Sequence, residues 1–353
     1  SREADNFLEM RLESFVEAKR RMPHLVMVGV LDHDTLNYLE PMYRVRKSFS
    51  PELLPQLLPG IEISCAFQHP TQDKQVQTHV IGYFPQLMEE NETVIRQVNT
   101  VLEPEMTRAL EGKIRKNVDI RLGYFFSNGI IPEHFDFDEL KVKVLEKLEE
   151  DKKYMESNEP KKGDIINWPL NSSEKMVVDV LVDEGVLYNF KEGKHYADRR
   201  NEKGIADLTQ ILVKKYKVSG KEARQTAEKL HGSCHGDYND DFYKLTTQDA
   251  ITLIIEAGGI PILAHPMISV KKFGGDVDAF FEYMKSEFLD LGLKGMEAFY
   301  PKQEKLTPQI INFCEREGLY ITGGSDDHQN GLKEIGDPNS QCPIKYVERM
   351  LGM

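Results

Sequence analysis

Short apolar runs, each followed by polar residues that include His, Asp or Glu, recur along this chain. They are Leu25 to Leu31 before Asp32-His33-Asp34, Gly60-Ile61 before Glu62, Ile260 to Ala264 before His265, and Leu319 to Thr322 before Asp326 and His328. Parallel strands covered by helices read as continuous apolar runs, and their carboxyl ends open onto loops that carry function. The pattern therefore predicts an α/β fold in which four strand ends meet at one site.

A different pattern, strict alternation of side chains, marks the segment from Val76 to Tyr83. Alternation is typical of a half-buried strand, because successive side chains point to opposite faces. Gln77, His79, Ile81 and Tyr83 then share one face. We expect His79 to face inward and to join the same site.

The stretch between His79 and His265 is too long for a simple connection and has helical periodicity. We expect helices at Glu92 to Ile120 with an interruption at Pro104, Glu139 to Glu156, Ser173 to Glu184, Ile205 to Tyr216, Gly220 to His231 and Thr246 to Ala257. The chain then divides into residues 1–96 and 244–353, which form a barrel, and a mostly helical insertion at 97–243 that covers the mouth of the site.

Length and charge fit an enzyme with two domains. The 353 residues provide ample core, and the net charge of −13 argues against a general nucleic-acid-binding surface. The negative charge does not exclude nucleotide substrates, because bound divalent metals reverse the sign of the electrostatic field within the site. The apolar run at 25–31 is too short to span a bilayer, so we expect no membrane segment. Cys65, Cys234, Cys314 and Cys342 form no C-x-x-C pair, and we predict a cytoplasmic protein.

The His, Asp and Glu residues that follow the apolar runs are the ligands that borderline divalent metals favour. Each has a plainer interpretation when taken alone. A single buried His is more often a hydrogen-bonded core residue, and Asp32-His33-Asp34 is equally compatible with a helix N-cap that includes Thr35. The ordered set of motifs favours a metal site.

In order and context these motifs resemble the PHP (polymerase and histidinol phosphatase) superfamily, in particular its predicted metal-dependent phosphoesterase branch. The resemblance covers about 1–95 and 245–353. The family's T-D-H-D-T, G-x-E, H-x-x-G-Y, A-H-P and G-x-S-D-x-H elements match Leu31 to Thr35, Gly60 to Glu62, His79 to Tyr83, Ala264 to Pro266 and Gly323 to His328, with Leu31 in place of the first Thr. It implies a distorted (β/α)7-type PHP barrel.

The resemblance also implies a function and a set of ligands. Two or three divalent metals, Mn, Zn, Fe or Mg, are expected on His33, Glu62, His79, His265, Asp326 and His328. Glu62 is expected to bridge two metals, and Asp326, His265 and Glu62 to be the catalytic residues. The implied activity is hydrolysis of phosphate esters by a metal-activated hydroxide. The expected substrates are nucleotides, nucleoside bisphosphates or short oligonucleotides.

Two family features are absent. The family opens with an H-x-H pair on a first strand and an Asp in the loop after it, and neither precedes His33. We expect that this first strand is missing from the sequence and that the natural protein is longer. The alternative is a catalytically degenerate PHP module with a ligand-binding or regulatory role. The phosphate-gripping Arg of the phosphoesterase branch is also absent, and Lys175 is the candidate substitute.

Other residues have weaker assignments. Tyr300 and Lys302 follow the run at Gly295-Met296 and are candidates for substrate binding, and Glu297 either lines the site or caps a helix. The cluster from His231 to His235 reads as an exposed loop. We expect His24, His69, His134 and His195 at the surface, because they lie beside Pro or charged residues.

Overall fold

The computed structural model describes residues 2–127, 131, 133–157, 245–325 and 340–352, with isolated positions between 180 and 225. The chain forms two compact units. One comprises residues 110–240, and the other comprises 2–109 with 241–353. Lys175, Asp326 and His328 lie outside the described residues, as do the helices expected at Ser173 to Glu184, Ile205 to Tyr216 and Gly220 to His231 over most of their length. The expected domain boundaries stay a prediction.

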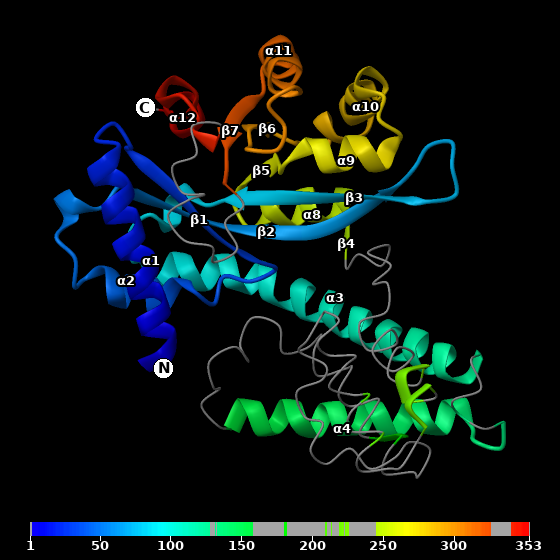
Figure 1. Cartoon of the computed structure of the whole chain (residues 1–353). Helices are drawn as coiled ribbons and strands as arrows, with labels where there is room; N and C mark the ends of the chain where they lie inside the picture. Colours follow the sequence, from blue (N-terminus) through cyan, green and yellow to red (C-terminus); the bar gives the residue numbers. More distant parts are fainter. Residues whose placement is uncertain are drawn as a thin grey trace. The chain divides into compact units, whose positions relative to one another are not determined.

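The second unit is built on one mixed sheet of seven strands, whose long β2–β3 hairpin is visible in Figure 1. The strands are β1 (Met27–His33), β2 (Gln56–Gln68), β3 (Gln75–Tyr83), β4 (Leu245–Thr246), β5 (Ile260–Leu263), β6 (Gly295–Phe299) and β7 (Tyr320–Gly323). Their order is β1-β2-β3-β5-β6-β7, with β4 paired to β2. Strand β3 is antiparallel to β2 and β5, and every other pairing is parallel.

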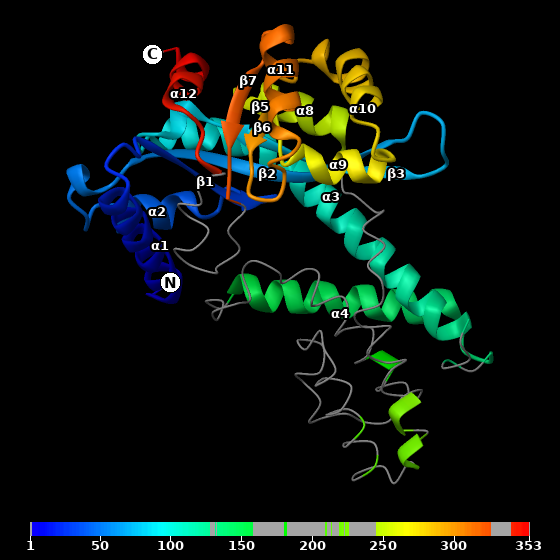
Figure 2. The same ribbon diagram turned by 45° about the horizontal axis from the view of Figure 1, so that its top comes forward.

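The α/β class is confirmed, and the expected distorted (β/α)7-type barrel is observed in part, as a seven-stranded sheet that is not closed among the described residues. Within the described residues the hydrogen-bonded path runs from β1 to β7, and no pairing joins these two edge strands. Figure 2 shows β5, β6 and β7 side by side at one end of this path. The sheet is compatible with a barrel-like fold that stays open along one edge.

Helices and short turns surround the sheet or belong to the other unit. They are α1 (Arg2–Arg21), α2 (Leu39–Arg46), η1 (Pro51–Leu53), η2 (Pro85–Leu87), α3 (Glu92–Ser127), α4 (Phe137–Ser157), α8 (Thr247–Glu256), α9 (Pro266–Phe273), α10 (Val277–Met284), η3 (Lys285–Leu289), α11 (Thr307–Glu317) and α12 (Ile344–Leu351). Helices α8 and α9 contact β3, α11 contacts β6 and β7, and α12 contacts β7. The sheet is therefore held by helices that follow its strands in sequence.

Three expected helices are described, and one differs from its prediction. Helix α8 begins where predicted, since the Thr246 hydroxyl accepts a hydrogen bond from the amide of Asp249 at 3.0 Å. The helix expected at Glu139 to Glu156 is α4. The predicted interruption at Pro104 is wrong, because α3 continues through it. Val98, Leu102 and Met106 are buried around the proline, and their packing outweighs one lost backbone hydrogen bond.

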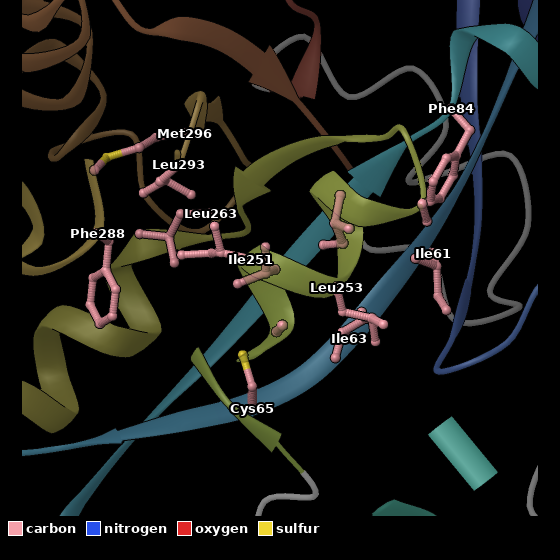
Figure 3. Packing of buried hydrophobic residues seen from close by; sticks show 14 of the residues in the cluster. Ile61, Ile63, Cys65, Phe84, Ile251, Leu253, Leu263, Phe288, Leu293 and Met296 are labelled. Carbon is pink, nitrogen blue, oxygen red and sulfur yellow. The ribbon is translucent and has the colours of Figure 1, made fainter. Parts of the chain in front are cut away.

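The two faces of the sheet carry different side chains. One face forms the main core with the helices and includes Ile61, Ile63 and Cys65 of β2, Val76 and Val80 of β3, and the residues in Figure 3. The opposite face carries a second cluster that includes Leu58, Ile81, Tyr83 and Ile262. The predicted parity of β3 is confirmed, because His79 alternates with the core residue Val80 and shares the face of Ile81 and Tyr83.

A tyrosine hydroxyl is inserted into the ladder between β1 and β2. Val30 of β1 is in register with Pro59 of β2, so the Val30 carbonyl faces the amide of the next residue, Gly60. The Tyr38 hydroxyl donates to the carbonyl of Val30 at 2.6 Å and accepts from the amide of Gly60 at 2.9 Å. Burial raises the pKa of this phenol, which stays neutral and can donate. Strand β1 is thereby fixed beside β2.

Several smaller expectations can be compared with the structure. His24 and His134 are exposed as predicted, but His69 is buried. Its Nε2 lies 2.8 Å from the carbonyl of Phe273, and its Nδ1 accepts from the amide of Thr71. These two hydrogen bonds replace the contacts with water that the His69 ring loses on burial. The neighbouring Pro70 gave no indication that the ring would be buried. Among the described residues no helix is long and apolar enough to cross a bilayer.

Candidate metal centre

The register of three strands gathers the predicted ligands on one face of the sheet. His33, the last residue of β1, is in register with Glu62 of β2. Glu62 in turn pairs with Ile81 of β3, so that His79 lies two residues along β3 on the same face. Diagonal neighbours of this kind are within reach of long side chains. Three residues from different strands therefore point into one site.

The fourth residue comes from the end of β5. The amide of Ala264 donates to the carbonyl of His79 at 2.9 Å, which brings the next residue, His265, beside the same group. Glu62 was expected where a strand ends, and that expectation is wrong, because β2 continues to Gln68. The antiparallel hairpin with β3 extends β2 past the site, and an apolar run alone does not indicate such an extension.

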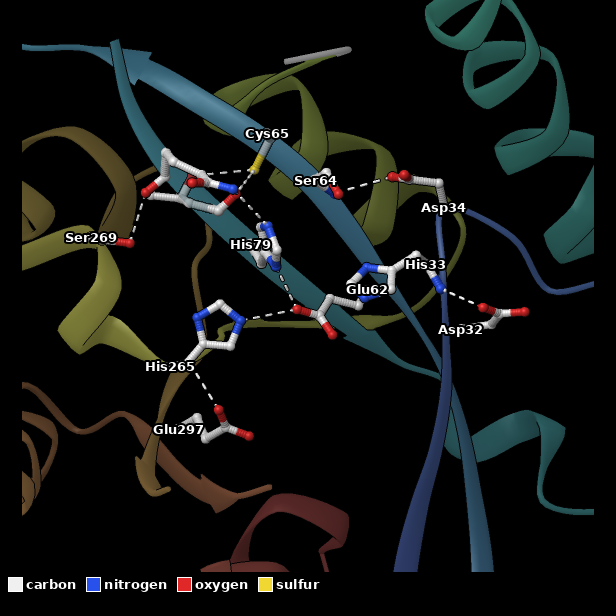
Figure 4. Close-up of polar contacts among 12 residues, drawn as sticks. Asp32, His33, Asp34, Glu62, Ser64, Cys65, His79, His265, Ser269 and Glu297 are labelled. Carbon is white, nitrogen blue, oxygen red and sulfur yellow. Dashed lines mark hydrogen bonds and ion pairs between the residues drawn. The ribbon is translucent and has the colours of Figure 1, made fainter. Parts of the chain in front are cut away.

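One carboxylate oxygen is the centre of the cluster, as Figure 4 shows. Glu62 Oε1 lies 2.6 Å from His79 Nδ1 and 3.1 Å from His265 Nε2. The rings of His79 and His265 are nearly perpendicular, with centroids 4.9 Å apart, and those of His33 and His79 are 5.7 Å apart. One ligand atom from each of His33, Glu62 and His79 lies within 4.8 Å of the others.

The electrostatics of the cluster favour an ionised carboxylate. Glu62 is 8% exposed, and burial by itself raises the pKa of its carboxyl. Hydrogen bonds from His265 and His79, with the nearby charges of His79 and His33, outweigh burial and lower that pKa overall. Glu62 therefore presents a negative charge that is available to a cation.

The two aspartates beside His33 have structural roles in the described chain. The Asp32 carboxylate accepts from the amide of His33 at 2.8 Å, and burial raises its pKa. Asp34 has φ of 57°; its amide donates to the carbonyl of Glu62, and its carboxylate accepts from the amide of Ser64. Asp34 thus continues the β1–β2 ladder. The helix N-cap alternative is wrong for this segment, because α2 begins only at Leu39.

His265 is held in an unusual backbone conformation by a buried carboxylate. Its φ is 26°, and the next residue, Pro266, begins α9. The amide of His265 donates to Glu297 Oε2 at 2.8 Å (Figure 4). The Glu297 carboxylate therefore lies beside the candidate site, bonded to the backbone of the residue that precedes α9.

Two glutamines that the sequence did not single out support the histidines. Gln77 Nε2 lies 3.3 Å from His79 Nε2, on the side of the ring away from Glu62. The buried Gln303 donates to the carbonyls of Glu297 and Ala298, and its side-chain oxygen accepts from the amide of Met267. Gln77 lies on the same face of β3 as His79, so the alternating sequence pattern could have indicated that it lies near this histidine. Gln303 lies in a turn, and no sequence pattern indicated its contacts.

The candidate substrate-binding residues lie in different environments. Tyr300 is only 2% exposed, and its ring centroid lies 5.7 Å from that of His265. Lys302 is exposed, and its Nζ lies 6.0 Å from the centre of the Tyr300 ring. Tyr300 therefore packs beside the cluster, whereas the ammonium group of Lys302 is open to solvent.

The chemistry of these side chains fits a divalent metal. Imidazole nitrogens and carboxylate oxygens bind zinc-like ions at about 2.0–2.2 Å, which places tetrahedral ligands roughly 3.3 Å apart. The separations of 2.6 and 3.1 Å around Glu62 are shorter than this by about 0.7 and 0.2 Å, so the side chains would move apart to admit the ion. His33, Glu62 and His79 would hold such an ion, and His265 lies on the same carboxylate oxygen of Glu62.

Comparisons with known proteins add a structural likeness. No family model and no curated protein matches the chain. An amidohydrolase from Chromobacterium violaceum, with bound sulfate and no metal, has 17% identity and a TM-score of 0.46 over 95% of this chain and 89% of that one. A protein from Bifidobacterium adolescentis described as a "putative metal-dependent phosphoesterase" has 17% identity and a TM-score of 0.40 over 96% and 89%. At these scores neither likeness assigns a function.

Proposed function

We propose that the protein is a metal-dependent phosphoesterase. The observation that carries the proposal is the sharing of Glu62 Oε1 between the imidazoles of His79 and His265, with His33 beside them. Three imidazoles around one buried carboxylate match the ligand preferences of Zn, Mn and Fe. The motifs that contain these residues follow one another in the order of the PHP phosphoesterases, and this order favours phosphate esters over other substrates.

In this proposal the residues of the site bind the metal ion and orient the groups around it. A divalent ion at this site would polarise a phosphoryl oxygen and lower the pKa of a bound water. Glu62 has two carboxylate oxygens and can serve two ions. The histidines bind a cation only when deprotonated, so activity is expected to fall at low pH. Because Glu62 is buried, solvent screens the charge of its carboxylate only weakly.

The proposed substrates are small phosphate monoesters such as nucleotides or nucleoside bisphosphates, with short oligonucleotides next. Among the described residues, we propose that Lys302 contacts the phosphate, because it is exposed and follows β6. Asp326 and His328 complete the proposed ligand set, and Lys175 is a second proposed phosphate contact.

Elemental analysis joined to a hydrolysis assay tests this proposal. The purified protein is loaded with Mn, Mg, Fe or Zn, its metal content is measured, and a panel of phosphate esters is assayed with each ion. We expect two or three ions per chain and release of inorganic phosphate with at least one ester. One ion or none, with no hydrolysis of any ester, would instead support the degenerate ligand-binding module.

A further inference from the structure

The backbone of His265 needs an explanation that local sequence does not provide. A residue with a side chain rarely adopts φ of 26°, because its Cβ then crowds the backbone. A strained conformation persists only where surrounding contacts enforce it. The strain directs the imidazole to Glu62, since His265 Nε2 reaches Glu62 Oε1 at 3.1 Å.

The contact that enforces this conformation comes from β6. Glu297 Oε2 accepts the amide hydrogen of His265 at 2.8 Å, and Glu297 is 4% exposed. A hydrogen bond to an ionised acceptor is roughly twice as strong as a neutral one. Gln303 fixes the backbone of Glu297 in turn, because its Nε2 donates to the Glu297 carbonyl at 2.7 Å. Gln303 thus restrains the backbone that carries the Glu297 carboxylate.

A glycine borders the other side of the same carboxylate. A methyl group added at Gly324 would collide with Glu297 Oε1. The amide of Gly324 donates to the carbonyl of Phe299 at 2.9 Å, which fixes this glycine against β6. Glu297 therefore fits between the backbone of His265, after β5, and the backbone of Gly324, after β7.

We infer that Glu297 is a positioning residue, which holds the backbone of His265 so that its imidazole reaches Glu62 and a bound metal. Gly324 is a glycine because this carboxylate occupies the space of a side chain. The inference rests on the proposed function only in assigning a metal to the histidine. Its structural part, the link from Glu297 to His265, is testable in metal-free protein.

Three substitutions test the inference from two directions. Glu297→Ala removes the acceptor, Glu297→Gln keeps an oxygen that accepts the His265 amide, and Gly324→Ala displaces the carboxylate without changing it. Gly112→Ala is the matched control, because an added methyl at Gly112 meets no atom within 4 Å. Cobalt titration followed by visible absorbance measures metal affinity. Hydrogen exchange of the His265 amide measures the contact in metal-free protein, and thermal unfolding checks the fold.

We expect Glu297→Ala and Gly324→Ala to weaken cobalt binding by about 10–100-fold and to speed exchange of the His265 amide. Glu297→Gln should restore slow exchange and lose less than about tenfold in cobalt affinity. If Glu297→Ala does not fold, the measurements on Gly324→Ala and Glu297→Gln test the inference. Unchanged exchange and affinity in Gly324→Ala, or in a folded Glu297→Ala, would overturn the inference. Wild-type protein that binds cobalt but hydrolyses no ester would refute the proposed activity and leave this inference standing.

Discussion

Glu62 on β2 and His265 after β5 are 203 residues apart in the chain, yet their side chains meet at 3.1 Å between Oε1 and Nε2. The two side chains meet across β3, which lies between β2 and β5 in the sheet. A buried carboxylate that binds two imidazoles is a strong local constraint. The candidate site therefore also joins the first and last parts of the sheet.

The histidine of this pair provides a direct test of the site. Replacing His265 or Asp326 with Ala should abolish phosphoesterase turnover while the fold remains. The loss should exceed the roughly 10–100-fold that follows when only a supporting residue is removed. His265→Ala should also lower the free energy of unfolding by about 1–3 kcal/mol, because Glu62 loses a buried hydrogen-bond partner.

Steady-state kinetics and urea unfolding measure the two effects. His24→Ala is the matched control, because His24 is exposed in the turn after α1 and should tolerate the change. If both His265→Ala and Asp326→Ala retained wild-type turnover, the candidate site would not be the active site.

The order of the ligands could be predicted from the sequence because each follows or lies in a recognisable strand pattern. The parity of His79 was readable from alternation, and the strand before His265 from its apolar run. The direction of β3 was not readable, since parallel and antiparallel strands share the same alternation. The reversal matters, because it places His79 diagonally across from Glu62 in mid-strand rather than at a strand end.

The supporting contacts were harder to predict because they depend on tertiary geometry. Glu297 and His265 meet only through the pairing of β5 with β6, and nothing near His265 in sequence indicates its φ of 26°. His69 was expected at the surface because it precedes a proline, yet its ring is buried against Phe273. Local composition cannot reveal a hydrogen-bond partner 204 residues away.

The lowered pKa of Glu62 predicts how metal-free protein responds to acid. Because the folded-state pKa lies below the ordinary value of 4.5, the ionised carboxylate stabilises the fold above that pH. The contribution should decrease as the pH falls below 4.5 toward the folded-state value. Urea unfolding in a chelating buffer, from pH 7 downward, should show this loss in wild-type protein.

Glu62→Gln is the matching variant, because it cannot ionise. Its free energy of unfolding should be lower than that of wild-type protein at neutral pH, and the gap should narrow in acid. A gap that stayed constant across the titration would mean that the carboxylate charge does not stabilise the fold.

Gln77 offers a test of how His79 is oriented. Its side-chain amide lies 3.3 Å from His79 Nε2, and the tautomer of the ring sets which of the two groups donates. When Nδ1, the nitrogen that faces Glu62, binds a metal, Nε2 carries the proton and the Gln77 side chain can accept it. Gln77→Ala should remove this support and weaken metal binding by about tenfold. Nitrogen NMR of the imidazole in metal-free protein reports the tautomer, and metal titration reports the affinity.

Gln75→Ala is the control for this variant, because Gln75 is exposed on the same strand and has the same parity as Gln77. It should leave both readouts unchanged. Equal effects of the two substitutions would show that the strand, and not the contact with His79, governs the site.

Tyr38 tests the link that fixes β1, and with it His33, beside β2. Tyr38→Phe removes the hydroxyl that bridges the carbonyl of Val30 and the amide of Gly60. Two backbone groups then lose a buried partner, and the free energy of unfolding should fall by about 1–3 kcal/mol. Exchange of the Gly60 amide should become faster.

The matched control is Tyr346→Phe, because the Tyr346 hydroxyl makes an exposed hydrogen bond to Glu315 at 3.1 Å. An exposed hydrogen bond of this kind changes stability by about 0.5 kcal/mol or less. Urea unfolding measured side by side should therefore separate the two phenylalanine variants. A Tyr38→Phe protein as stable as Tyr346→Phe would mean that β1 is held by the remaining ladder alone, and that the hydroxyl does not secure the strand that carries His33.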